Sequence, residues 1–122
     1  MHRMVVDEER ESLLLRGALD MCVLALLRDR PGHAYELVTR LQDRGFTTSS
    51  YGTIYPLVTR LARLGLVIKT SRPSADGPAR HELSLTETGA AALIEWEAQW
   101  HDVTARVASV LGSPESSRRN RG

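Results

Sequence analysis

Apolar residues recur at helical spacing between residues 49 and 67, where the hydrophobic pattern of the chain is clearest. The stripe that this predicted helix should bury consists of Ile54, Leu57, Val58, Leu61 and Leu64. The opposite face, which is nearly free of acid, presents Gly52, Thr53, Tyr55, Pro56, Thr59, Arg60 and Arg63. Ser49 or Ser50 is placed to cap the start of the helix, and Gly65 to end it. Hydroxyl and guanidinium groups on an outward face are suited to lie against a polyanion.

Two further helices are predicted upstream. The segment Leu13–Leu27 is apolar nearly all round, so we expect it to be buried on several sides, in part by a second chain. After a break at residues 30–32, an amphipathic helix spans residues 33–44. A short connection joins it to the helix that begins near Ser50, which is the spacing of a helix-turn-helix.

A β-hairpin should follow, because residues 66–70 and 80–85 both have strand-like patterns and flank the turn-rich segment 71–79. Arg72 and Arg80 then lie beside the hairpin tip, where they could contact a phosphate backbone. On the alternative interpretation the hairpin only closes the domain, and its charges keep it solvated. Helix, helix and hairpin in this order predict a winged helix-turn-helix, a mainly α fold with a small β-hairpin.

The last predicted element is a long helix capped by Thr86. Its apolar positions are separated by alternating steps of three and four, and they are Leu93, Trp96, Trp100, Val103, Val107 and Val110. Such a seam is typical of a coiled coil, so we expect a homodimer interface here, to which Leu14 and Leu19 also contribute. The predicted organisation is an N-terminal arm (1–12), a winged helix-turn-helix (13–85), a dimerisation helix (86–111) and a disordered basic tail (112–122).

Charge supports a nucleic-acid partner more by its distribution than by its total, which is only +1. Residues 28–81 hold nine Lys or Arg against four acids, whereas residues 82–111 hold five acids against Arg106 alone. A clustered basic surface is typical of nucleic-acid binding, although solvated surface charge that is merely uneven would give the same count.

The composition argues against an enzyme or a metal protein. Cys22 is the only cysteine, lies in an apolar run and is interpreted as a core residue. The histidines show no metal-ligand spacing, and no nucleophile–base arrangement or phosphate-binding loop is present, so no catalytic residue, metal or cofactor is predicted. The first residues do not resemble a signal peptide, and no apolar run is long enough to span a membrane. We therefore expect a cytoplasmic protein.

Three segments together resemble the PadR family of transcriptional regulators: GHAYEL (32–37), GTIYPLVTRLARLGLV (52–67) and GPARHELSLTETG (77–89). Ile54 stands where the family's recognition helix has leucine, and His81-Glu82-Leu83 replaces its Lys-Tyr-Tyr. The resemblance implies a homodimeric repressor that is released from its operator by a small molecule. It also implies that DNA is bound by Ser50, Tyr51, Thr53, Tyr55, Pro56, Lys69, Arg72 and Arg80. The outward face of the predicted helix adds Arg60 and Arg63 to this set.

Trp96 and Trp100 allow two interpretations. As large residues on the seam they could simply anchor the dimer interface. Similar small PadR proteins instead use facing tryptophans to hold a flat aromatic effector. A protein-interaction module and a metal-responsive regulator remain alternatives for the whole chain, and steep salt dependence of duplex binding would distinguish a DNA-binding protein from an adaptor.

Overall fold

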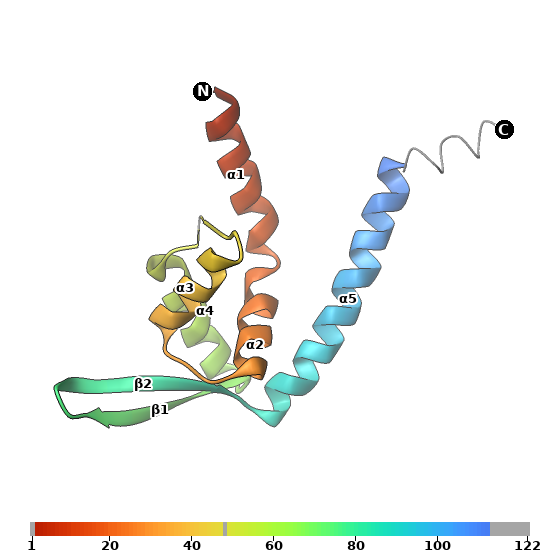
Figure 1. Cartoon of the computed structure of the whole chain (residues 1–122). Coiled ribbons are helices and arrows are strands. Elements are labelled where there is room, and N and C mark those ends of the chain that lie inside the picture. The colour runs from red at the N-terminus through yellow and green to blue at the C-terminus, as the bar shows by residue number, and fades with distance from the viewer. Residues whose placement is uncertain (1, 48, 113–122) are drawn as a thin grey trace.

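The computed structural model describes residues 2–47 and 49–112 (Figure 1). Its elements, in chain order, are α1 (His2–Arg16), α2 (Leu19–Asp29), α3 (Ala34–Asp43), α4 (Tyr51–Arg63), β1 (Val67–Ser74), β2 (Gly77–Leu85) and α5 (Glu87–Leu111). This arrangement confirms the predicted fold class, a winged helix-turn-helix with a long C-terminal helix. The predicted tail, apart from Gly112, lies outside the described residues.

The core lies where α2, α3 and α4 meet the base of the hairpin. Helix α4 contributes Ile54, Val58 and Leu61, as its hydrophobic pattern predicts, whereas Leu64 is 58% exposed beyond the end of the helix. Arg40 fixes α3 to the end of α2, because its Nη2 donates to the carbonyl oxygen of Leu26 at 2.8 Å. The same carbonyl accepts a second hydrogen bond, from the Arg30 backbone N–H at 3.2 Å, at the end of α2.

The predicted helix over Leu13–Leu27 is two helices, α1 and α2, separated by Gly17 and Ala18. Only α2 is buried on several sides, since α1 projects beyond the body of the molecule (Figure 1). Leu13 and Leu14 consequently remain 56% and 62% exposed. The boundary expected between residues 12 and 13 therefore falls within α1.

The hairpin is longer than its sequence pattern suggested. Its strands pair from Val67 with Leu85 out to Ser74 with Gly77, so most of the expected loop 71–79 is strand. Prolines at 73 and 78 are compatible with this because each strand of a two-stranded ribbon has an outer edge. Gly32 and Leu83 exchange two backbone hydrogen bonds, of 3.1 and 2.8 Å, which join the base of the hairpin to the start of α3.

Helix α5 begins in close contact with the turn that ends α4. Thr86 Oγ1 accepts a hydrogen bond from Gly89 N at 2.9 Å, as expected of its cap, and donates to the Gly65 carbonyl at 2.7 Å. Gly65 has φ +80°, a conformation that favours glycine. A Cβ atom on Gly89 would overlap the Leu66 carbonyl oxygen, so only glycine fits at this contact.

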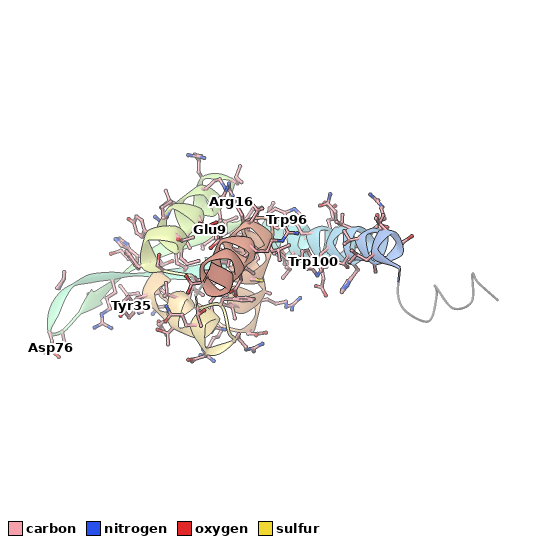
Figure 2. The ribbon with its side chains drawn as sticks, turned by 90° about the horizontal axis from the view of Figure 1, so that it is seen from above. Glu9, Arg16, Tyr35, Asp76, Trp96 and Trp100 are labelled. Atoms are coloured by element: carbon pink, nitrogen blue, oxygen red, sulfur yellow. The ribbon has the colours of Figure 1, made fainter. Side chains whose placement is uncertain are left out.

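Beyond its first turns α5 leaves the body of the molecule, diverging from α1 (Figures 1 and 2). The predicted seam therefore changes character along the helix: Leu93 is buried, Trp96 is half-buried, and the residues from Trp100 onward are exposed. We expected Leu19 and Leu93 in a dimer interface, but the structure buries both in the chain's own core. Their exposed fractions of 8% and 1% leave them little surface for a second copy.

Candidate nucleic-acid interface

Helix α4 presents its polar residues outward because its apolar stripe is held by the core. The predicted contact residues on and before it are all exposed, namely Ser50, Tyr51, Thr53, Tyr55, Pro56, Arg60 and Arg63. Ser50 occupies the N-cap position, and its hydroxyl is hydrogen-bonded to the Thr53 hydroxyl at 3.2 Å. The Thr59 hydroxyl is already used, since it donates to the Tyr55 carbonyl at 3.0 Å.

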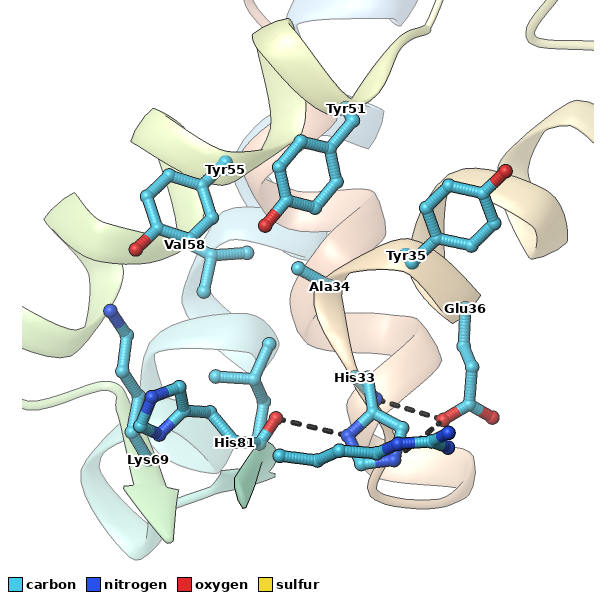
Figure 3. Close-up of a pocket in the computed structure, with 11 residues that line it drawn as sticks. His33, Ala34, Tyr35, Glu36, Tyr51, Tyr55, Val58, Lys69 and His81 are labelled. Atoms are coloured by element: carbon cyan, nitrogen blue, oxygen red, sulfur yellow. Dashed lines mark hydrogen bonds and ion pairs between the residues drawn. The ribbon is translucent and has the colours of Figure 1, made fainter. Parts of the chain in front are cut away.

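A row of tyrosine rings continues this face onto α3, and Lys69 of the hairpin lies against one end of the row (Figure 3). The rings of Tyr51 and Tyr55 are stacked with centroids 5.4 Å apart, and Tyr35 of α3 lies 6.3 Å from Tyr51. The Lys69 ammonium lies 5.4 Å from the centre of the Tyr55 ring, which is cation–π distance. The tyrosine row and Lys69 together bring residues of α3, α4 and β1 to one face.

These residues border a cavity of about 410 Å³ between the start of α3, α4 and the hairpin. Figure 3 shows the tyrosine rings along one side of this cavity, with Lys69 and His81 opposite them. Arg80 also lines it. The cavity thus combines phenol hydroxyls and cations, the groups that bind phosphate and sugar oxygens.

Among the described residues that line this cavity, Glu36 is the one with an acidic side chain, and its carboxylate contacts the neighbouring His33. Its Oε1 accepts a hydrogen bond from the His33 backbone N–H at 3.0 Å and lies 3.6 Å from His33 Nε2. His33 Nδ1 donates to the His81 carbonyl at 3.1 Å, which joins α3 to strand β2. The result is a fixed spacing between the start of α3 and the hairpin.

The predicted cations fall into two groups. Arg60 lies 3.6 Å from the Asp20 carboxylate of α2, and Arg72 lies 3.1 Å from Glu82 across the hairpin. Lys69, Arg80 and Arg63 have no acid within ion-pair distance among the described residues, and so they present their full charge to a ligand.

Sequence reasoning missed Tyr35, and the hydrophobic pattern placed Tyr55 but not Tyr51 on the outward face of the helix. In the structure Tyr35 is 70% exposed and borders the cavity, and Tyr51 and Tyr55 are equally exposed, at 45% and 46%. The signal for Tyr35 was present in the GHAYEL motif, which was interpreted only as a helix start. Which of its residues face α4 depends on how the two helices pack, and no local pattern shows that.

Trp96 and Trp100 lie together at a second cavity, of about 360 Å³, between α5 and the junction of α1 and α2. It is lined by Gly17, Asp20, Met21, Trp96, Gln99, Trp100 and Val103. Figure 2 shows Trp96 where α5 leaves the body and Trp100 farther along the helix.

The remaining candidates for chemistry have structural roles. Cys22 packs against the core, and burial, together with the nearby Asp20 carboxylate, raises the pKa of its thiol. No group of three or more potential metal ligands occurs among the described residues. In the same part of the chain, no helix has both the length and the apolar character that crossing a membrane requires.

The fold and the α4 face are those of a winged-helix protein that binds DNA. Comparison with known families then gives the identification: residues 23–95 match the model of the transcriptional regulator PadR-like family. The chain therefore belongs to this family of DNA-binding transcriptional regulators, which confirms the family predicted from the three sequence motifs. Members of the family are regulators rather than enzymes, in agreement with the composition.

Solved structures give the same result. A PadR family regulator from Eggerthella lenta is 34% identical, with 90% of this chain and 98% of that one covered and a TM-score of 0.77. A PadR-like regulator from Bacillus cereus is also 34% identical, and the match covers 84% of this chain and 99% of that one with a TM-score of 0.73. Bacillus subtilis PadR in complex with operator DNA shares the fold at 20% identity, and the match covers 65% of this chain and 46% of that one with a TM-score of 0.60. A search among curated proteins gave no match.

Proposed function

We propose that this regulator is a homodimeric repressor that binds its operator through α4 and the hairpin, and that a small aromatic effector releases it. The observation that carries the proposal is the outward face of α4, where hydroxyl groups and unpaired cations adjoin the tyrosine row. Bacillus subtilis PadR, which has the same fold, was crystallised with operator DNA.

In this proposal each group on the face has a definite role. The N-terminal part of α4, with Ser50, Tyr51, Thr53, Tyr55 and Pro56, enters the major groove, where tyrosine and threonine combine hydrogen bonding with contact to thymine methyl groups. Lys69, Arg80 and Arg63 contact phosphates, which position the helix without specifying sequence. Arg60 and Arg72 join them only if they exchange their acidic partners for phosphate.

Dimerisation is supported by the apolar residues that the single chain leaves uncovered. On α5 the exposed fractions of Trp100, Val103 and Val107 are 41%, 41% and 51%, and that of Val110 is 87%. Together with Leu13 and Leu14 of α1 they form the surface that a second copy would cover. Two copies related by a twofold axis would place their α4 helices on half-sites about one turn of DNA apart.

The effector is proposed to bind at the cavity that Trp96 and Trp100 share. Indole rings provide flat apolar contact, and the cavity shares Trp100 and Val103 with the surface that dimerisation would cover. Trp96→Ala should then reduce effector affinity more than operator affinity. Quenching of tryptophan fluorescence by candidate aromatic compounds would measure the first, and its absence with every compound would leave only a packing role.

A pair of matched variants tests operator binding. Arg63→Gln removes an unpaired cation from the α4 face, whereas Arg28→Gln removes the same charge from the end of α2, where Arg28 pairs with Glu97 at 3.5 Å. Fluorescence anisotropy with an operator selected from a random duplex library should show weaker binding and a lower salt slope for Arg63→Gln only. Equal effects of the two variants would mean that net charge, and not the α4 face, determines binding.

Repression and release are tested in cells with a reporter gene placed behind the selected operator. The wild-type protein should lower expression, and a compound that quenches its tryptophan fluorescence should restore it. Higher expression with the wild-type protein would identify an activator and refute the repressor assignment.

A further inference from the structure

A third cavity, of about 360 Å³, lies between the last turns of α1 and the start of α4. It shares none of its lining residues with the tyrosine-lined cavity or with the tryptophan cavity. Its polar lining consists of Ser12, Arg16, Ser49, Thr53 and Arg60, and three leucines complete it. Among the described residues the lining therefore holds two cations and three hydroxyl groups but no acid.

The Ser49 hydroxyl indicates that this cavity accommodates a polar ligand. Ser49 is 2% exposed, and its Oγ has no hydrogen-bond partner among the described residues. Its backbone is satisfied, because its N–H donates to the Phe46 carbonyl at 3.1 Å and its carbonyl accepts from Gln42 Nε2 at 3.0 Å. A buried hydroxyl without a partner costs free energy, so such groups are normally paired. Since Ser49 lines the cavity, an oxygen atom of a ligand bound there would supply the partner.

Two guanidinium groups make the cavity suited to an anion. Arg16 has no acid within ion-pair distance among the described residues. Arg60 lies 3.6 Å from Asp20, which is longer than a hydrogen bond, so its five N–H groups remain available to an anion. Guanidinium groups bind phosphate by two parallel hydrogen bonds each, and a phosphate group has enough oxygen atoms to accept from both arginines and from a hydroxyl.

The first turn of α4 favours negative charge at the same place. The helix begins at Tyr51, between Ser49 and Thr53 of the cavity lining, and its first turn contains no acid. The N-cap residue, Ser50, forms no side-chain hydrogen bond to the helix backbone, because its hydroxyl is bonded to that of Thr53 at 3.2 Å. The partial positive charge of the helix N-terminus is therefore not offset by its own cap.

We propose that this cavity binds a phosphate group, with Arg16 and Arg60 pairing with its charge and the Ser49 hydroxyl donating to one of its oxygens. A small phosphorylated compound and the DNA backbone both present such a group, and the experiment distinguishes these two sources. The cavity is larger than a phosphate ion requires, so it leaves room for the part of the ligand that carries the phosphate.

Isothermal titration calorimetry of inorganic phosphate into the full chain, at constant ionic strength and without DNA, tests the site. The proteins compared are the wild type, Arg16→Gln, Ser49→Ala and Arg10→Gln. Arg10→Gln is the matched control, because it removes the same charge from α1 at a position that does not line the cavity. Acetate, which has one charge and two oxygens, is the control anion.

Arg16→Gln should weaken phosphate binding about tenfold and Ser49→Ala about fivefold, whereas Arg10→Gln should bind as the wild type does. In thermal melts without phosphate, Ser49→Ala should be at least as stable as the wild type, since it removes a buried hydroxyl that lacks a partner. The inference is overturned if the wild type binds no phosphate, if acetate binds as tightly, or if Arg16→Gln and Ser49→Ala retain full affinity. A lower melting temperature of Ser49→Ala would also overturn it, because the hydroxyl would then be paired in the free protein.

Fluorescence anisotropy with the selected operator then identifies the source of the phosphate. Operator affinity that is unchanged in Arg16→Gln and Ser49→Ala assigns the site to a free phosphorylated compound. Weaker operator binding by both variants, but not by Arg10→Gln, assigns it to the DNA backbone. If the protein binds no operator, the proposed function fails, while the phosphate titration still decides this inference because it contains no DNA.

Discussion

Replacing Glu82 by glutamine should make DNA binding tighter and more sensitive to salt. Arg72 and Glu82 are diagonal neighbours on the two strands of the hairpin, where Arg72 pairs with Arg80 and Glu82 pairs with Thr70. Both Nε and Nη2 of Arg72 lie 3.1 Å from one Glu82 oxygen. Glu82 thus offsets the charge of a cation that the hairpin would otherwise present to a phosphate. Glutamine has nearly the same shape as glutamate but no charge, so the substitution releases Arg72 without disturbing the strand pairing.

The magnitude follows from the number of unpaired cations. If Lys69, Arg80 and Arg63 each neutralise one phosphate in both subunits, the slope of log K against log salt is about −5. Releasing Arg72 in both subunits changes the slope to about −7. Between about 50 and 200 mM salt the wild type should then lose about 10³ in affinity, and Glu82→Gln about 10⁴.

Fluorescence anisotropy of a labelled duplex, titrated at several salt concentrations, measures both quantities. Glu95→Gln is the matched control, because it removes the same charge from an exposed position on α5, away from the hairpin. A Glu82→Gln slope equal to that of the wild type would refute the reasoning, since it would mean that Arg72 either reaches phosphate despite Glu82 or never reaches it. An equal gain from Glu95→Gln would assign the effect to net charge.

Three further predictions concern other parts of the molecule. Tyr55→Ala should weaken operator binding at least about tenfold, because the proposed complex needs this ring both to contact DNA and to support Lys69, and sedimentation of the variant should match that of the wild type; normal binding would place the DNA contacts elsewhere. Val107→Glu should raise the dimer dissociation constant more than about tenfold in sedimentation equilibrium, since a charge would be buried on the exposed seam of α5, and an unchanged dimer would rule that seam out. Gly89→Ala should lower the free energy of unfolding by about 1–3 kcal/mol in denaturant titrations, because the new methyl group collides with the Leu66 carbonyl; wild-type stability would show that the contact relaxes freely.

Local sequence patterns predicted α3, α4, α5 and the presence of a hairpin, because each of these depends on neighbours along the chain. The spacing of Ile54, Val58 and Leu61 sets which side of α4 is buried, and hence which side is free. The caps and stops at Thr86 and Gly65 are short-range features of the same kind. The three motifs were specific enough to give the family, and with it the class of partner.

Tertiary packing decided which of the predicted side chains are available. It buried Leu19 and Leu93 in the core, paired Arg60 with Asp20, and brought Tyr35 beside Tyr51. Each of these contacts joins residues from different helices, and its existence depends on crossing angles and register that one helix's pattern does not contain. The sequence by itself determined that a cationic, hydroxyl-bearing helix face exists, whereas only the folded chain decided which of its charges are unpaired and which cavity adjoins them.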